Sequence, residues 1–545
     1  MQPEKVKTVI APTRLCRVEL FFAVFLIALA AFFHFLLQKN AGAFWRDECS
    51  SILLARAKSW SDVFNGLFTD SFPALWVVLL RLWDLLGGGS GEVWIRSFGL
   101  WLSMGAIASL WYAAKTARLL PPVLAIALIA FNPAVFYWGD SLRAYALAML
   151  LVVLLFGFVW RFCEEGGLKN FVIAAVTAIL AAQSNYQSSY LILAICVAGA
   201  LVCAVSGRRW RGVIVIGIGI LAAFSMVPYR PVIVQYSESA KLLTIPDVNA
   251  ALLWNRFSEG FDSTISLSIF VELYVLSLAL PVYYRLSRAH QQNRDAFHRS
   301  LYASSAALIA PIGCYVFARK AGFSTQSWYY IPILGLFGIA IEMSISGLGE
   351  RLRVRQLRLL LAGLVVVAGV APVWKHAHMR RTTMDIAADQ VSKTASADDL
   401  VLVNPFWEVV SFQYYYKGNA PWSILPVVPD EERGRSFSAT MPLMTSREPL
   451  KTTYERIEKT LRNGGKLLVV GGLQRATTVP PEWIPAPHPD YGWQSSEFVK
   501  VWSMQTGWFM EQHALERKVL PVDNNQRVNR FEDVETIVIF SGWKD

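Results

Sequence analysis

Two adjacent carboxylates, Asp47 and Glu48, follow the first long apolar run of the chain, residues 20–37. Ionisable side chains at the edge of a bilayer are costly and usually functional. A carboxylate there can accept a proton from a substrate hydroxyl. The pair therefore predicts chemistry on a substrate carried by a lipid, although a solvated loop or a helix cap explains the same two residues equally well.

Further polar residues recur in the segments that connect the later apolar runs. Cations among them can neutralise a departing phosphate, and carboxylates can activate an acceptor hydroxyl. This mixture predicts glycosyl transfer from a lipid phosphate. The residues predicted to bind the phosphate and sugar of the donor are Asp70, Asp140, Arg143, Tyr145, Asn185, Arg256, Arg319, Lys320 and Tyr329.

Structural roles compete with these functional ones. Arg143 and the pair Arg319-Lys320 are typical of cations that anchor helix ends at a membrane interface. Tyr329 is typical of the aromatic belt of a membrane protein. Asp70 precedes a proline-containing helix start and predicts an N-terminal cap, a role compatible with catalysis.

The composition is that of a membrane protein. Of the 545 residues, 54% are hydrophobic, 17% are charged and 20 are Trp, which is too apolar for soluble domains of this length. The net charge of +11 comes mainly from Lys and Arg in short loops, so it reflects membrane topology, and no nucleic acid is expected as a partner. The six cysteines are scattered without a C-x-x-C pair, so neither a disulfide framework nor a zinc site is encoded.

Runs of about 20 apolar residues predict about eleven membrane spans. They lie at 20–37, 94–114, 119–138, 142–161, 168–183, 188–205, 212–229, 265–284, 301–318, 328–347 and 357–374. Segment 72–86 is ambiguous, because it is short and contains Arg81 and Asp84. If it stays on the outer surface as an amphipathic helix, every basic loop becomes cytoplasmic, as the positive-inside rule requires. The N-terminus is then cytoplasmic and the C-terminus extracytoplasmic.

The predicted fold is an all-α polytopic membrane bundle followed by an external α/β domain. Residues 1–374 form the bundle, with external loops at 38–93 and 230–264, and residues 375–545 form the domain, where the composition becomes polar and rich in proline. Within the domain, segments 399–403, 466–470 and 536–540 predict buried strands, and 450–463 predicts a helix.

Four short segments, taken in order, resemble the GT-C glycosyltransferases. They are W-R-D-E at 45–48, D-S-F-P-A-L-W at 70–76, R-A-Y-A-L at 143–147 and Y-Y-I-P at 329–332. The nearest branch is similar to bacterial relatives of protein O-mannosyltransferases and of the aminoarabinose transferase that modifies lipid A. The resemblance covers the chain from about residue 17 to 374 and is weak in the external domain.

This resemblance implies that Asp47 is the catalytic base and Glu48 its usual companion. It also implies inversion at the anomeric carbon in one displacement, with polyprenyl phosphate as the leaving group. Members of the family typically have His, a second Pro and a late Arg where this chain has Phe72, Ala74 and Trp328. The donor contacts made by those three positions are therefore not carried over.

The partners implied are a polyprenyl-phosphate-linked sugar, membrane lipids and an envelope acceptor, which is a lipid, glycan or protein. The implied location is a bacterial inner (plasma) membrane, crossed many times. Some relatives bind a divalent cation, and Asp47, Asp70 and Asp140 could provide its oxygen ligands. No spacing in the sequence requires such a cation.

Two other functions fit a chain with many spans. A transporter or flippase of lipid-linked substrates also has charges within its membrane part, but it typically has repeated halves around a midplane site, and no repeat is visible here. A non-catalytic envelope assembly protein would use the external domain as its working part.

Overall fold

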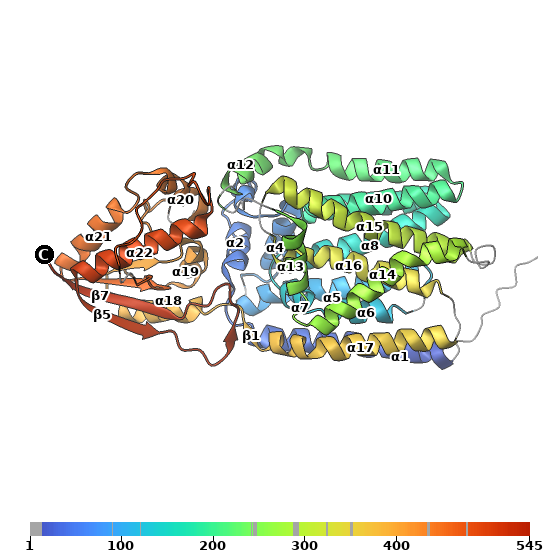
Figure 1. Ribbon diagram of the computed structural model, residues 1–545, viewed down its shortest axis with the longest axis horizontal. Helices are drawn as coiled ribbons and strands as arrows, with labels where there is room; N and C mark the ends of the chain where they lie inside the picture. The colour runs from blue at the N-terminus through green and yellow to red at the C-terminus, as the bar shows by residue number, and fades with distance from the viewer. Residues whose placement is uncertain are drawn as a thin grey trace, which may run out of the picture.

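The computed structural model describes residues 14–545 except 90, 120, 241, 243–247, 287–293, 323–324, 349–351, 433–435 and 476–477. Long helices run along the long axis of the molecule, and an α/β domain lies at one end of this bundle (Figure 1). We call that end of the bundle the domain end and the opposite end the far end. The first helix begins at the far end, so the chain enters and leaves the bundle at opposite ends.

The bundle contains α1 Arg14–Asn40, α5 Glu92–Thr116, α6 Val123–Ala130, α7 Pro133–Gly139, α8 Tyr145–Glu165, α9 Leu168–Ser184, α10 Ser188–Val205, α11 Arg209–Phe224, α14 Thr264–Leu286, α15 Arg294–Ala321, α16 Ile331–Ser346 and α17 Leu352–Ala377. Among the described residues, nine helical stretches are long and apolar enough to cross a membrane. Helix α9, with 17 residues, is slightly shorter. Together with the pair α6 and α7, these helices account for the eleven predicted passes.

The span predicted at 119–138 is divided into two helices, α6 and α7. Asn132 caps α7, since its Oδ1 accepts the N–H of Val135 at 3.0 Å. Pro133 occupies the first position of α7, where its missing N–H is harmless, whereas inside a continuous helix it would remove a hydrogen bond. Helix α7 ends at Gly139, and a turn connects it to α8.

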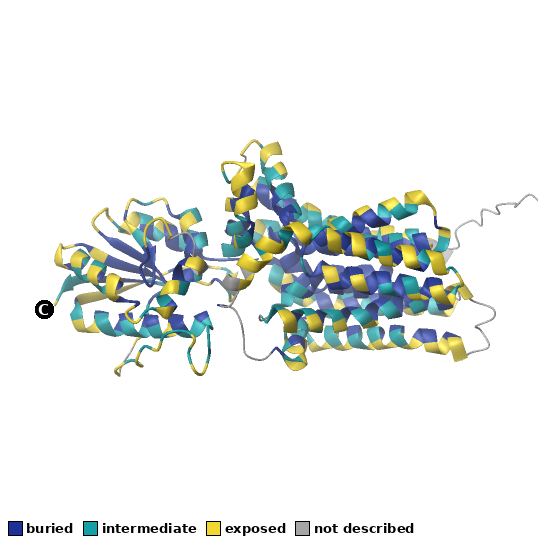
Figure 2. Cartoon of the chain, turned by 90° about the horizontal axis from the view of Figure 1, so that it is seen from above, coloured by how far each residue is buried: buried dark blue, intermediate teal, exposed yellow. Residues whose placement is uncertain are grey.

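Burial separates the central helices from the peripheral ones. Helix α6 is completely buried and α16 nearly so, whereas α1, α11, α14 and α17 expose apolar side chains such as Phe21, Phe35 and Val367. Figure 2 shows the buried residues concentrated inside the bundle and on the sheet of the domain. An apolar and exposed outer surface is what lipid-facing helices require.

The far end of the bundle is tied together by buried ion pairs. Arg358 of α17 contacts Glu19 of α1 at 3.2 Å and also pairs with Glu342 of α16. The second oxygen of Glu342 accepts the N–H groups of Leu124 and Ala125 at 2.9 and 3.0 Å. One connected group of charges therefore fixes the ends of four helices.

Short helices cover the domain end of the bundle. They are α2 Arg46–Ala55, α3 Trp60–Asn65, η1 Leu67–Thr69, α4 Ala74–Leu86, η2 Val227–Tyr229, α12 Arg230–Ala240, α13 Ala250–Glu259 and η5 Ser327–Tyr330. Helix α4 has 13 residues, about 20 Å in length, which is too short for a bilayer core of about 30 Å. The predicted cap at Asp70 is wrong, because α4 begins at Ala74 and Pro73 is its N-cap residue.

The C-terminal domain is built on a five-stranded sheet. Its elements are β1 Met379–Arg380, α18 Met384–Thr394, β2 Leu400–Val403, η6 Phe406–Glu408, α19 Val409–Tyr415, β3 Trp422–Ile424, α20 Ser436–Thr445, α21 Lys451–Arg462, β4 Lys466–Val470, α22 Ser495–His513, β5 Ala514–Pro521, β6 Arg527–Val528 and β7 Thr536–Trp543. The strand order is β3-β2-β4-β7-β5; β2 is parallel to both neighbours and β7 antiparallel to both of its own. The three strands and the helix predicted from the sequence are confirmed as β2, β4, β7 and α21.

A separate two-stranded pair brings the end of the chain to the bundle. Strand β1 follows α17 directly and pairs in parallel with β6. The N–H of Asn529 then donates to the carbonyl of Arg380 at 3.0 Å. Residues 529–532 consequently lie at the domain end of the bundle.

Candidate functional site

Glu48 joins α2 to the turn between α7 and α8. Its side chain is fully buried. One oxygen accepts the N–H of Trp45 at 3.1 Å, and the other accepts the N–H of Leu142 at 2.9 Å. Arg381 Nε lies 3.6 Å from the second oxygen. The helix-cap interpretation is therefore confirmed for Glu48, and its catalytic role stays a prediction.

Asp47 is placed differently from its neighbour. It lies on the first turn of α2, and its side chain is 31% exposed. Its Oδ1 is 3.4 Å from Nε of Arg46, and its backbone carbonyl accepts a hydrogen bond from Arg143 at 3.1 Å. Arg143 thus holds the backbone of Asp47, while the carboxylate remains partly accessible to solvent.

Arg143 and Asp70 form a buried ion pair beside α2. Arg143 Nη1 lies 2.7 Å from Asp70 Oδ1, and the side chains are 5% and 0% exposed. Ser51 completes the arrangement, because its hydroxyl donates to Asp70 Oδ2 at 2.8 Å and accepts from Arg143 Nη1 at 2.9 Å. Although burial lowers the pKa of Arg143, the carboxylates of Asp70 and Asp47 raise it by more, so the pKa lies above its ordinary value.

Aromatic rings cover this ion pair. The guanidinium of Arg143 lies 4.4 Å above the ring of Phe72, a cation–π contact. Phe72 contacts Tyr145 edge to face at 5.4 Å between ring centroids, and Tyr145 packs on Tyr329 at 6.1 Å. The structure therefore brings together five of the predicted site residues, Asp47, Asp70, Arg143, Tyr145 and Tyr329.

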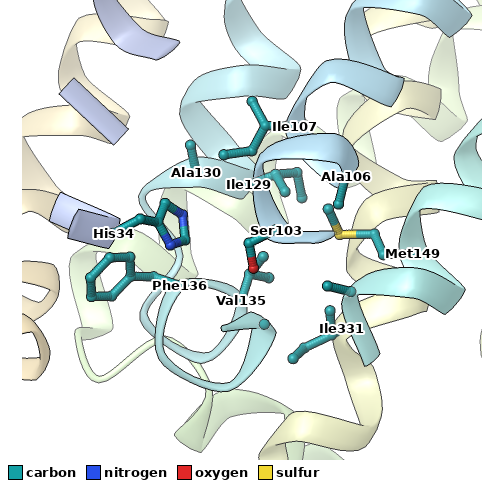
Figure 3. Close-up of a pocket in the computed structure, with 12 residues that line it drawn as sticks. His34, Ser103, Ala106, Ile107, Ile129, Ala130, Val135, Phe136, Met149 and Ile331 are labelled. Carbon is teal, nitrogen blue, oxygen red and sulfur yellow. The ribbon is translucent and has the colours of Figure 1, made fainter. Parts of the chain in front are cut away.

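Asp140 turns away from this cluster and into the bundle. Its Oδ1 is 2.9 Å from Nδ1 of His34, although the two atoms are not aligned as a hydrogen bond, and its Oδ2 accepts from Gln38 at 3.4 Å. Figure 3 shows His34 and Ser103 around a small, mostly apolar cavity between the helices. Side chains of α1 therefore hold Asp140 inside the protein.

The remaining predicted residues have other partners. Asn185 accepts the N–H of Gln187 at 2.9 Å in a local turn. Arg256 pairs with Glu259 at 3.1 Å. Arg319 donates to the hydroxyl of Tyr315 at 3.3 Å, and Lys320 is exposed beside it at the end of α15. None of these contacts leads to the cluster around Arg143.

The described residues contain no group of three or more His, Cys, Asp or Glu side chains that could hold a metal ion. Asp47, Asp70 and Asp140 are thus not gathered as a ligand set. A divalent cation bound by Asp47 stays a prediction, which dialysis against EDTA tests directly.

Three functional-site residues escaped the sequence analysis, and all belong to the C-terminal domain. Arg381 contacts Glu48 and donates to the carbonyl of Tyr137 at 2.8 Å. Tyr415 and Glu532 contact the start of α2. The signal for Arg381 was the basic pair 380–381 after the last span, on the side predicted to be external, where the positive-inside rule predicts few cations.

A cavity of about 510 Å³ opens beside the site, between the bundle and residues 528–531. Trp138 and Phe531 line it, and both also pack on Trp328, with centroids 4.3 and 4.9 Å apart. Trp138 packs in turn on Trp45, the residue before α2. One layer of aromatic rings therefore connects the cavity to the helix that carries Asp47.

The charges in the cavity wall are paired. Lys375 contacts Asp262 at 2.8 Å, and Arg530 contacts Glu259 at 3.2 Å. Aromatic rings beside hydrogen-bonding groups suit a sugar, and the two cations can turn to a phosphate.

No protein-family model and no curated protein matches the sequence. Solved structures do match the fold. Apo ArnT from Cupriavidus metallidurans aligns with a TM-score of 0.52 and 12% identity over 96% of this chain and 98% of that one. ArnT from the same organism bound to undecaprenyl phosphate aligns with a TM-score of 0.48 and 13% identity over 95% and 97%. The oligosaccharyltransferase AglB from Archaeoglobus fulgidus, in complex with an inhibitory peptide and a dolichol-phosphate, gives 0.47 and 11% over 83% and 69%.

The apo ArnT comparison shows that this chain shares the fold of ArnT, which is a GT-C glycosyltransferase. Because 96% of the chain is covered, the match extends through the helical bundle into the C-terminal domain. The predicted fold class is confirmed.

Proposed function

We propose that this chain, with the fold of the GT-C enzymes, is a membrane glycosyltransferase. It moves a monosaccharide from a polyprenyl-phosphate donor to a hydroxyl of an envelope acceptor on the external face of the membrane. The observation that carries the proposal is the accessible carboxylate of Asp47. A general base must reach its substrate, and of Asp47, Glu48, Asp70 and Asp140 only Asp47 has a partly exposed side chain, whereas the other three are buried.

In the proposed reaction Asp47 takes the proton of the acceptor hydroxyl. The oxygen of that hydroxyl forms a bond to the anomeric carbon of the sugar, and the bond from this carbon to the phosphate oxygen breaks. The electron pair of the broken bond leaves with the polyprenyl phosphate. Attack and departure on opposite sides of the carbon give inversion.

The cavity beside α2 is the proposed seat of the donor head group. Its wall combines the ring of Trp138, on which a sugar can stack, with Lys375 and Arg530, which can neutralise the phosphate. The predicted role of Arg143 in binding this phosphate stays a prediction. Its pairing with Asp70 favours a role in holding the turn beside Asp47 instead.

Purified protein tests the proposal. It is incubated in detergent with a polyprenyl-phosphate mannose or aminoarabinose donor, and release of polyprenyl phosphate is measured with an envelope extract as acceptor. Asp47→Asn keeps the shape of the side chain but removes the base, so we expect transfer to fall about 10²- to 10⁴-fold. Asp389→Asn, an exposed change on α18, is the control. Substantial transfer by Asp47→Asn would remove Asp47 from the catalytic role.

The acceptor is identified in cells. Mass analysis of envelope lipids and glycans, with and without the gene for this protein, should reveal one sugar modification that depends on Asp47. A change that persists with Asp47→Asn would instead favour transport of a lipid-linked substrate.

A further inference from the structure

The start of α2 is completed by side chains of the C-terminal domain. The N–H of Phe44 donates to the hydroxyl of Tyr415 at 2.7 Å, and the N–H of Arg46 donates to Glu532 Oε2 at 2.9 Å. The N–H between them is satisfied within α2 itself. The acceptors are 371 and 486 residues away in sequence. The helix that carries Asp47 is therefore capped from another part of the fold.

Glu532 is held firmly in this position. Its side chain is buried, and its second oxygen accepts from the hydroxyl of Ser411. Its own N–H donates to the carbonyl of Asn529 at 3.2 Å, in the loop that follows the pairing of β6 with β1. Ser411 and Tyr415 both belong to α19, so one helix of the domain positions both acceptors.

Charged groups surround Glu532 at this helix start. Arg46 and Asp47 approach it from α2, and Glu408 approaches from η6. Burial and the two carboxylates oppose a negative charge on Glu532, whereas Arg46 favours one, so Glu532 serves the helix start through the hydrogen bond that it accepts from Arg46.

We propose that Glu532 and Tyr415 are positioning residues for Asp47, through which the C-terminal domain controls the activity of the site on the bundle. This inference rests on the proposed role of Asp47 as the base. Helix α2 has only ten residues, and so short a helix depends on tertiary contacts for its stability. Loss of the two acceptors leaves N–H groups unpaired at the turn that carries Asp47.

Enzyme kinetics in detergent separates positioning from simple support of the fold. We expect Glu532→Ala to lower kcat about 10- to 100-fold, as small misplacements of a catalytic group do, with the donor KM nearly unchanged. Glu532→Gln should keep most of the activity, because its amide oxygen still accepts from Arg46 and its NH₂ can donate to Ser411. Tyr415→Phe should lower kcat in the same manner.

Two matched controls lie in the same domain. Tyr416→Phe removes the neighbouring hydroxyl, which bonds to the backbone of Ala420 within the domain. Glu511→Gln changes an exposed carboxylate that pairs with Arg475. Both controls should retain the kcat of the wild type.

Hydrogen exchange of the backbone at 44–50 gives a readout that needs no substrate. Exchange should be faster in Glu532→Ala and Tyr415→Phe than in the controls, while the rest of the domain keeps its protection. Unchanged exchange at 44–50, or wild-type kcat in Glu532→Ala, would overturn the proposal. If the wild type itself transfers no sugar, the proposed function fails, and the exchange result alone decides whether the domain positions α2.

Discussion

The ion pair between Arg143 and Asp70 offers a sharp test of how the site is built. Asp70→Asn removes the charge but keeps the size of the side chain. Arg143 then carries an uncompensated charge at a position where it is 5% exposed. Breaking a buried pair from one side costs about 3–5 kcal/mol, so we expect a clear loss of stability. Ser51 and the N–H of Ser71 donate to different oxygens of Asp70, and Asn supplies only one acceptor oxygen, so the amide does not offset the loss.

The double variant Asp70→Leu with Arg143→Met gives the comparison. Replacement of both partners by apolar groups of similar size leaves no charge behind and is often neutral for stability. The double variant should therefore melt at a higher temperature than Asp70→Asn alone. The assay is the apparent melting temperature in detergent, followed by tryptophan fluorescence.

The outcome also bears on the role of Arg143. A double variant that is stable but inactive would assign Arg143 and Asp70 to the function as well as to the fold. If Asp70→Asn proves as stable as the wild type, the guanidinium is reached by water or by another anion, and the reasoning from burial is refuted.

Three further changes have clear expected outcomes. A Cβ at Gly99 would lie 2.2 Å from the carbonyl oxygen of Asp140, so Gly99→Ala should displace the turn 140–143 and lower transfer, whereas Gly363→Ala on α17, where a Cβ meets no atom within 4 Å, should not. Burial raises the pKa of Glu532 to about 7, above the unfolded value of about 4.3. The stability that protonated Glu532 contributes is therefore complete below about pH 4.3 and is lost as the pH rises through about 7. The melting temperature of the wild type should fall more between about pH 5.5 and 8 than that of Glu532→Gln. Cysteines introduced at exposed Lys58 or Asp389 should react with an impermeant maleimide in spheroplasts, whereas those at exposed Lys169 or Arg209 should react only after permeabilisation; the reverse pattern would invert the predicted topology.

The spans and the central strands could be predicted because their signals are local. Apolar runs of membrane length and short runs of β-branched residues depend on neighbouring positions in the chain. Asn and Pro are typical of a helix start, but Asn132-Pro133 lies within a long apolar run, so the hydropathy pattern did not predict the break. The prediction that segment 72–86 does not cross the membrane rested on loop charges, and the 13 residues of α4 agree with it in length.

The partners within the site could not be predicted, because they are far apart in sequence. Asp140 pairs with His34 rather than with the site, and Glu48 bonds to Leu142 across 94 residues. No spacing rule relates Arg46 to Glu532. A sequence pattern could select Asp47 as a carboxylate at the membrane edge, but only the packing reveals that its neighbours are engaged and that it is accessible.

The bond from Arg46 to Glu532 also sets the order in which the protein can mature. Helix α2 emerges early in translation, just after the first span, whereas Glu532 is made some 486 residues later. Until the loop that contains Glu532 has been synthesised and has folded next to β1, the N–H of Arg46 at the start of α2 lacks this acceptor. A chain interrupted after residue 531 would contain every span and Asp47 itself, yet its reactive helix would be incomplete. With the proposed role of Asp47, we expect a chain that lacks the end of the C-terminal domain to be inactive even though all of its spans are present.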